Sequence, residues 1–154
     1  MDHKDSILLE DPEITVSASE LMLGDFVKTR KGVMRVRSIN LGGPIMCGKT
    51  KDQNTWDSFY EHEIYPIDID STVLEQNGFK EAHFERYELK NGDKVLVLAY
   101  APTRYNRRWN WMISSNNSTK HKGESNTDNN TYIGFINYVH ELQHVLHLLK
   151  FHAL

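Results

Sequence analysis

The residues best suited to chemistry lie near the end of the chain, in the run His140-Glu141-Leu142-Gln143-His144. This is the H-E-x-x-H pattern of zinc hydrolases, and it stands in an amphipathic stretch, residues 133–154, that predicts a helix. On a helix both histidines lie one turn apart on one face, where their imidazoles can reach one Zn²⁺. Glu141 would then be the catalytic base that polarises a zinc-bound water. One hypothesis is therefore a zinc-dependent hydrolase.

This zinc hypothesis needs a third ligand. Catalytic zinc takes three protein ligands and a water molecule, and zincins supply the third from beyond the motif. Among the residues that follow His144, His147 lies one helical turn away and could join His140 and His144 as a metal ligand. Three ligands on one straight helix give poor tetrahedral geometry. The alternative is an amphipathic helix that carries these polar side chains along its exposed edge and needs no cofactor.

A second stretch, Gly43–Thr50, matches the phosphate-loop pattern G-x-x-x-x-G-K-[ST]. In such a loop the backbone N–H groups surround the phosphates, and Lys49 and Thr50 would contact phosphate and Mg²⁺. A phosphate loop must run into a long buried helix, whereas residues 51–57 continue as a polar turn and a predicted strand. The local pattern therefore favours a Gly-Pro turn followed by a surface lysine.

The segment Tyr100–Trp111 packs three arginines and four aromatic residues into twelve positions. Guanidinium groups pair with phosphate in bidentate fashion, and tryptophan and tyrosine rings stack on bases. Side chains of a strand alternate between two faces, so one face can enter the core while the other lines a cleft. The alternative is a solvated turn whose tryptophans lie in the core. The candidate ligand-binding residues are Arg104, Tyr105, Arg107, Arg108, Trp109 and Trp111.

The elements that must position these residues begin with a hairpin. Residues 25–29 and 33–39 alternate in polarity, and Gly32 can take the positive φ that the turn between them requires. Arg35 and Arg37 share one face of this hairpin and would extend a positive patch. One or two further strands before residue 69 would complete a small barrel. The pattern predicts an N-terminal arm, 1–16, and an SH3-like β-barrel module, 17–69.

A second module is predicted over residues 70–154. Thr72 and Glu75 have the spacing of a capping box, and Asn77-Gly78 is a good end for a short capped helix. An antiparallel β-meander follows, with its tight turn at Asn91-Gly92. Its strands are predicted over 83–89, 94–100 and 109–113.

Two segments complete this module. Residues 114–130 carry no large apolar side chain, which predicts a mobile loop. The chain then ends in the C-terminal amphipathic helix, with a core stripe of Phe135, Val139, Leu142, Leu146 and Leu149. The predicted fold class is thus α+β.

Composition sets broad limits on function. The chain has 18 basic and 21 acidic residues, so no global positive field marks a nucleic-acid binder and any basic site must be local. The single cysteine, Cys47, allows no intramolecular disulfide and fits a reducing compartment. The polar N-terminus does not resemble a signal peptide, and no apolar run reaches membrane-spanning length. These features predict a cytoplasmic protein with no membrane partner; its small core makes a homodimer possible.

Three stretches together resemble a group of small uncharacterised proteins of Bacteroidales genomes, their mobile elements and their phages. They are Leu23–Val27 with Gly32–Ile39, then Pro66–Phe79, and finally Tyr138–Leu146 with its Tyr-Val-His-Glu-Leu-Gln-His run. The resemblance implies the same architecture, with the SH3-like part first, in the cytoplasm of a bacterial host. It also weighs against a metal site, because members of the group vary at the positions of Glu141 and His144.

Three classes of function remain. The expectation is a non-enzymatic binding protein of phage or mobile-element type that holds an anionic ligand through the Arg/Trp cluster. A nucleotide signal, a nucleic acid or an acidic surface of a host protein would fit, and an anti-defence role against host immunity would follow. The alternatives are a zinc metallohydrolase using the H-E-L-Q-H motif and a purely structural module.

Overall fold

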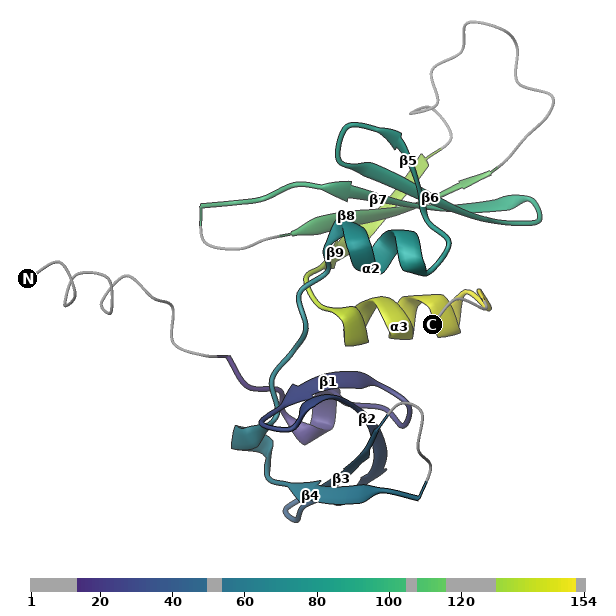
Figure 1. The fold of residues 1–154 in the computed structure, drawn as a ribbon. Coiled ribbons are helices and arrows are strands. Elements are labelled where there is room, and N and C mark those ends of the chain that lie inside the picture. Colours follow the sequence, from purple (N-terminus) through teal and green to yellow (C-terminus); the bar gives the residue numbers. More distant parts are fainter. Residues whose placement is uncertain (1–13, 50–53, 105–107, 116–129, 152–154) are drawn as a thin grey trace, which may run out of the picture. The chain divides into compact units, whose positions relative to one another are not determined.

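The structure is a computed structural model that describes residues 14–49, 54–104, 108–115 and 130–151. Across these residues the chain is a mixed α+β protein with more strand than helix, as predicted. The strands form two antiparallel sheets, one of four strands and one of five (Figure 1). The chain divides into two compact units, unit 1 (residues 1–67) and unit 2 (residues 68–154). None of the helices in the described ranges is long and apolar enough to cross a membrane.

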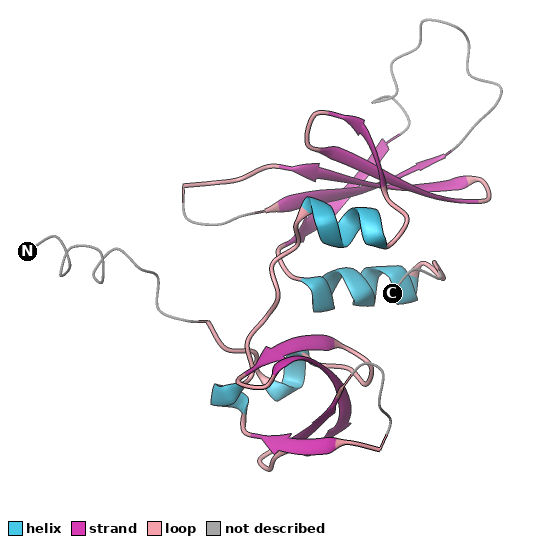
Figure 2. Ribbon diagram, viewed as in Figure 1, coloured by secondary structure: helices cyan, strands magenta, loops and turns pink. Residues whose placement is uncertain are grey.

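Unit 1 is built on the four-stranded sheet, whose strands pair in chain order (Figure 2). The predicted hairpin is confirmed, and Gly32 takes the positive φ of +99° that its turn requires. A short 3-10 turn precedes the first strand and another follows the last. The elements are η1 (Ala18–Glu20), β1 (Phe26–Thr29), β2 (Gly32–Ile39), β3 (Ile45–Gly48), β4 (Trp56–Phe59) and η2 (Glu61–Glu63).

The segment after η2 returns to the first strand. Lys28 and Tyr65 exchange two backbone hydrogen bonds of 2.9 Å, and the N–H of Val16 donates to the carbonyl of Ile64 at 3.0 Å. The segment after β4 thus reaches the free edge of β1, which requires the sheet to curve. Its four named strands pair as an open sheet and no closed barrel is found among them, so the SH3-like barrel stays a prediction.

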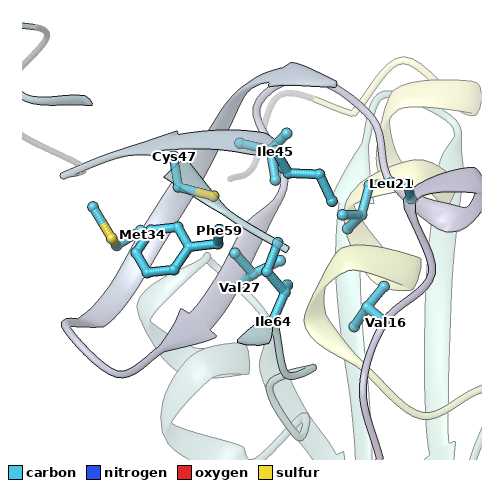
Figure 3. Packing of buried hydrophobic residues seen from close by; sticks show 10 residues of the cluster. Val16, Leu21, Val27, Met34, Ile45, Cys47, Phe59 and Ile64 are labelled. Carbon is cyan, nitrogen blue, oxygen red and sulfur yellow. The ribbon is translucent and has the colours of Figure 1, made fainter. Parts of the chain in front are cut away.

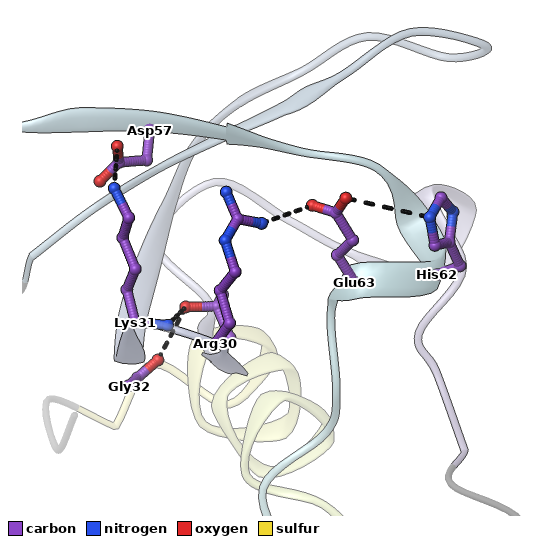
Figure 4. Close-up of polar contacts among 7 residues, drawn as sticks. Arg30, Lys31, Gly32, Asp57, His62 and Glu63 are labelled. Atoms are coloured by element: carbon purple, nitrogen blue, oxygen red, sulfur yellow. Dashed lines mark hydrogen bonds and ion pairs between the residues drawn. The ribbon is translucent and has the colours of Figure 1, made fainter.

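Two ion pairs fasten the β1–β2 turn to the opposite edge of the sheet (Figure 4). Arg30 pairs with Glu63 of η2 at 2.9 Å, and Lys31 pairs with Asp57 of β4 at 2.8 Å. The Arg30 guanidinium also lies 4.8 Å from the centre of the Phe59 ring. These ion pairs are partly exposed, so each contributes about 0–1 kcal/mol to the stability of the fold. They also show that the sheet curves, because they join the β1–β2 turn to β4 and η2.

The core of unit 1 comes from the inward side chains of all four strands (Figure 3). Alternate residues of β1, β2 and β3 are buried, as expected for a sheet with one covered face. Residues before β1 and after β4 complete the cluster. Its members are Val16, Ala18, Leu21, Val27, Met34, Val36, Ile45, Cys47, Phe59 and Ile64. Val16 was assigned to the predicted arm, 1–16, but it is a core residue; residues 1–13 of that arm lie outside the described residues.

Unit 2 places two helices on one face of the five-stranded sheet (Figures 1 and 2). Its strands also pair in chain order, as the predicted meander requires. The elements are α2 (Ser71–Gln76), β5 (Lys80–His83), β6 (Arg86–Asn91), β7 (Lys94–Tyr100), β8 (Trp109–Ser115), β9 (Asn130–Ile136) and α3 (Val139–Leu148).

The central strand, β7, is buried on both faces along its middle. Four successive residues, Val95 to Leu98, are each at most 5% exposed. The tight turn predicted at Asn91-Gly92 is confirmed, with Gly92 at φ +61°, and it joins β6 to β7 in register. The rigid centre of unit 2 is therefore the β6–β7 hairpin.

The last part of unit 2 differs from the prediction. The helix expected from residue 133 begins at Val139, because Asn130–Ile136 forms strand β9 against β8. The segment contains residue types that favour a strand, namely Thr131, Tyr132 and Ile133. Gly134 is unfavourable in the interior of a helix. Phe135 is therefore not part of a helical core stripe, and its side chain is 48% exposed.

Two smaller features were also predicted wrongly. Helix α2 is capped by Asp70, whose carboxylate accepts from the N–H of Val73 at 2.8 Å, and not by a Thr72–Glu75 capping box. The predicted strand 83–89 is two strands, because Glu85 takes a positive φ of 56° in the turn between β5 and β6. The end of α2 at Asn77-Gly78 is confirmed.

The predicted mobile loop, 114–130, lies largely outside the described residues. Its first and last positions do not belong to a loop, because Ser114 of β8 pairs with Asn130 of β9. The sheet register thus continues to these two residues.

Candidate functional site

Glu141 of the H-E-x-x-H motif caps helix α3. Its Oε1 accepts from the backbone N–H groups of Asn137 and Tyr138, both at 3.0 Å. This is the reciprocal half of a capping box, in which an acidic residue three positions into the helix satisfies free N–H donors. A carboxylate held in this way is turned toward the helix start, where it cannot polarise a water on a metal between the two histidines.

The motif's histidines differ in their surroundings. His140 is 2% exposed and packs its ring against Tyr138, with 5.9 Å between ring centres. The His144 ring stands edge-on to His140 at 5.8 Å, while His147 is exposed. The residues described by the structure contain no group of three His, Cys, Asp or Glu side chains arranged to hold a metal ion. The geometry therefore gives the motif a role in helix capping and core packing.

The phosphate-loop pattern also has another explanation. Ile45–Gly48 is strand β3, paired with β2 on one side and β4 on the other, so its backbone N–H groups cannot surround a phosphate. Lys49 is exposed, as predicted, and Thr50 lies outside the described residues. The Gly42-Gly43-Pro44 turn that precedes the strand is confirmed.

The candidate residues of the Arg/Trp cluster are separated by the fold. Tyr105 and Arg107 lie outside the described residues, and Arg104 is exposed. Trp109 is 5% exposed, and its indole N–H donates to the carbonyl of Ile69 at 3.3 Å. The Trp109 ring also packs against Tyr87 and Tyr100. Trp109 is therefore a core residue, and its burial does not favour the predicted role of its ring in ligand binding.

The two remaining members lie on opposite faces of the sheet. Trp111 shares the helix-covered face with Trp109 and is half-buried opposite Gly134. A side chain at position 134 would approach the Trp111 indole nitrogen, at 3.6 Å from an ideal Cβ. Arg108 instead lies over the ring of Phe135, with its guanidinium carbon 4.5 Å from the ring centre.

A second set of arginines stands on unit 1, in a row that runs across all four strands on the outer face. Phe26 pairs with Arg35, Arg35 with Gly48, and Gly48 with Trp56. Val27, Met34, Val36 and Cys47 are core residues next to members of the row on β1, β2 and β3, so the row lies on the outer face. We call these four residues, with Arg37 two positions beyond Arg35, the outer arginine row.

The arginines of this row are held against the sheet by their neighbours. The Arg35 guanidinium carbon lies 4.5 Å from the centre of the Phe26 ring, within the range of a cation–π contact. Arg37 lies across Gly48, with its Nε 3.1 Å from an ideal Cβ at that position. One of its Nη groups donates to the carbonyl of Lys49 at 3.4 Å. Glycine is required at position 48 because a Cβ there would lie 2.8 Å from the backbone carbonyl oxygen of Thr55 and would also press on Arg37.

Both arginines carry positive charge that the described residues do not balance. The Nε atoms of Arg35 and Arg37 are buried and have no hydrogen-bond partner in the parts of the chain that are described. The ion pairs between acidic and basic side chains in the described part of unit 1 involve Arg30 and Lys31 instead. Buried unsatisfied donors are rare in native proteins, and a missing ion or ligand is a common reason for them. At the far end of the row, Trp56 is 49% exposed.

The sequence indicated part of this row. Alternation along β2 put Arg35 and Arg37 on one face, and the structure confirms it. Phe26, Gly48 and Trp56 were missed as their neighbours, because they come from three other strands whose register the sequence does not specify.

Comparison of the chain with protein-family models, with curated proteins and with solved structures finds no match.

Proposed function

We propose that this protein is a non-enzymatic binding protein that holds an anionic ligand on the outer arginine row of unit 1. One observation carries the proposal: two adjacent guanidinium groups share an outward face and have no carboxylate partner among the described residues. The same class of function was expected from the sequence at residues 104–111. Arg35 and Arg37 form the better site for an anion, because Trp109 of that segment is buried.

The chemistry of the row suits a phosphate or carboxylate. A guanidinium group offers a planar fork of N–H donors that matches two oxygens of such an anion. Arg35 packs on the Phe26 ring, and Arg37 packs across Gly48, which has no side chain. Both arginines are thus ordered before the anion binds, so little side-chain entropy is lost on binding. With an overall charge of −3 the chain does not attract anions everywhere, so the attraction is local.

The aromatic end of the row favours an anion with a flat group attached. Trp56 pairs with Gly48 and keeps about half of its surface exposed. Tryptophan offers a large rigid face on which a base can stack. A nucleotide, with phosphates at Arg35 and Arg37 and its base at Trp56, fits this order of residues.

We also propose that unit 1 is an SH3-like barrel. The order of its elements supports this, since four antiparallel strands are followed by the 3-10 turn η2 and then by Tyr65, which pairs with β1. The ion pairs from the β1–β2 turn to Asp57 and Glu63 support a sheet that curves back on itself. Small barrels of this kind carry many unrelated binding functions on their outer faces, so the fold alone does not select a ligand.

The biological setting is a further proposal. The resemblance of three stretches to proteins of Bacteroidales phages and mobile elements supports a protein that acts on its host, in the host cytoplasm. Sequestering a nucleotide signal or covering an acidic surface of a host protein would use the arginine row and would need no catalytic residue. A homodimer would present the row twice.

The test is titration calorimetry with two probes, inorganic pyrophosphate and ADP, on the full chain and on the double variant Arg35→Gln/Arg37→Gln. We expect both probes to bind the native protein and ADP to bind more tightly, because only ADP can stack on Trp56. The double variant should lose about tenfold or more in affinity for both, since each charged hydrogen bond is worth about 1.5–3 kcal/mol.

The matched control is Arg30→Gln/Lys31→Gln, which removes the same charge from the β1–β2 turn. It should bind both probes almost as the native protein does, apart from a small effect of net charge. An affinity loss that is equal in the two double variants would show a general charge effect. That result, or the absence of binding to the native chain, would reject the arginine row as the site.

A further inference from the structure

Unit 2 carries a row of its own on the sheet face that the helices do not cover. Arg86 of β6 pairs with Ala99 of β7, Ala99 with Asn110 of β8, and Asn110 with Phe135 of β9. Side chains in one such row lie on one face of a sheet, about 5 Å from strand to strand. The four residues therefore form a line across four strands.

The direction of this line follows from its neighbours. Tyr87, Leu98 and Trp109 alternate with the row along β6, β7 and β8, and all three are at most 5% exposed. Trp109 donates to Ile69, just before helix α2, which identifies its face as the helix side. The row from Arg86 to Phe135 is on the opposite face.

The row combines three kinds of side chain. Phe135 is 48% exposed and carries the guanidinium of Arg108 over its ring at 4.5 Å. Beside it, the side-chain oxygen of Asn110 is buried without a hydrogen-bond partner among the described residues. A buried amide oxygen without a hydrogen bond lowers the stability of the fold. A ligand with a donor group near Asn110 would therefore stabilise this part of the sheet.

The surfaces around the two rows share some features, although in unit 2 the stacked arginine, Arg108, lies beside the row and not in it. Each has an arginine stacked on a phenylalanine with 4.5 Å between guanidinium carbon and ring centre. Each has a small residue in the middle of the row, which is Ala99 in unit 2 and Gly48, covered by Arg37, in unit 1. Each also leaves one aromatic ring about half exposed. Two sites that each offer an arginine and an aromatic ring suit a polymer whose repeating units each carry an anionic group and a flat ring.

We infer that the ligand is a single-stranded nucleic acid and that unit 2 binds it through Arg108, Asn110 and Phe135. This inference rests on the proposed function, because it gives the anion of unit 1 a polymeric identity. A single strand supplies phosphates for the arginines, unstacked bases for the rings, and base edges whose amino groups can donate to Asn110. A duplex hides its base faces, and a mononucleotide occupies one row only.

The experiment measures fluorescence anisotropy of labelled oligonucleotides with the full chain. The probes are single-stranded DNA and RNA of about 12 nucleotides, a site size typical of such proteins, and the blunt duplex of the same sequence. The variants are Phe135→Ala, Asn110→Ala and Arg108→Gln. The control is Lys94→Gln, which removes one charge from the other face of the sheet. Circular dichroism at each step checks that the variants keep the native fold.

The native chain should bind the single strands at least about tenfold more tightly than the duplex. Loss of the ring in Phe135→Ala should weaken binding by about 5- to 100-fold, the usual effect of one stacked base. Arg108→Gln should lower the slope of affinity against salt by about 0.7, the value for one phosphate contact on a single strand. Lys94→Gln should leave both quantities unchanged.

Three results would overturn the inference. Binding of single strands that is the same in Phe135→Ala and Asn110→Ala as in the native chain would remove unit 2 from the site. Equal binding of duplex and single strand would mean that the backbone alone is bound. Pyrophosphate and ADP binding that depends on Arg35 and Arg37, without oligonucleotide binding, would reject the polymer and leave the proposed function standing; an acidic peptide would then be the next ligand to test.

Discussion

Cys47 lies on the inner face of β3, fully buried, and pairs across the strands with Asp57. Burial, with a smaller contribution from the negative charge of Asp57, raises the pKa of its thiol to about 11. The thiol is therefore protonated at neutral pH and is a poor nucleophile. Cys47 is therefore a small residue of the core.

The first residue-scale prediction concerns stability at alkaline pH. In the unfolded chain the Cys47 thiol loses its proton near the ordinary cysteine pKa of 9.0, whereas in the folded protein it keeps the proton up to a pKa of about 11. The unfolded state thus binds fewer protons in this window, so the free energy of unfolding should fall as the pH rises from about 9 to about 11. Urea unfolding at a series of pH values measures this fall.

The variant Cys47→Ala separates the thiol from the lysines and tyrosines that titrate in the same range. Its free energy of unfolding should be lower at neutral pH and should decline less steeply than that of the native chain between about pH 9 and about pH 11. Parallel curves for the two proteins would show that Cys47 does not titrate in this way.

At the scale of elements, the start of α3 shows what a short motif can mean when its surroundings are known. Glu141 receives two backbone N–H groups, which would otherwise lack partners at the first turn of the helix. His140 points into the core from the next position of the same turn. The glutamate of the motif is therefore explained by the needs of a helix that begins shortly after a strand.

Substitution at Glu141 distinguishes a role of this residue in helix capping from a role in a metal site. Glu141→Ala removes the cap and should cost about 0.5–2 kcal/mol of stability, measured by urea unfolding. Glu141→Gln keeps an acceptor oxygen at the same place and should cost less. A metal-site role predicts instead that neither change affects the metal-free protein, and that zinc added to the native chain raises its melting temperature. That pair of results would revive the hydrolase.

The sequence specified the elements whose signal is local. Gly32 and the Asn91-Gly92 pair marked two hairpins correctly, because each turn needs a residue that accepts a positive φ. Asn77-Gly78 marked the end of α2 for the same reason. Strand β9 was missed because its apolar residues also fit a helical period, and its pairing with β8 is set by tertiary contacts.

The candidate sites were less accessible to sequence reasoning than the fold. In the cluster predicted at residues 104–111, Trp109 and Trp111 lie on the helix-covered face of the sheet, whereas Arg108 lies over Phe135 on the other face. The outer arginine row is the reverse case, since its members come from four strands and meet only through register. Cross-strand rows of this kind have no signature in the sequence of any one strand.

At the scale of the whole molecule, each unit has a core of its own. Phe59 is at the centre of one core and Leu142 of the other, and neither side chain is exposed. The two rows proposed as binding sites belong to different units.

Separate cores predict separate effects of core substitutions. Phe59→Ala should cost about 3–5 kcal/mol and Leu142→Ala about 2–5 kcal/mol. Hydrogen exchange followed by mass spectrometry should show that protection falls mainly in residues 14–67 for the first variant and in residues 68–151 for the second. Leu142→Met, which keeps the volume, should have little effect. A uniform loss of protection across the chain in either alanine variant would contradict this independence.

The pairing of Lys28 with Tyr65 also bears on the order in which the chain folds. The β6–β7 hairpin joins neighbouring residues across a two-residue turn and can form within microseconds of its synthesis. Closure of unit 1 has a higher contact order, since its first strand meets its last partner only after all the intervening strands are in place. During translation, β1 must therefore remain with an unpaired edge until Tyr65 has left the ribosome, so this edge is the part of the nascent chain most exposed to wrong pairing.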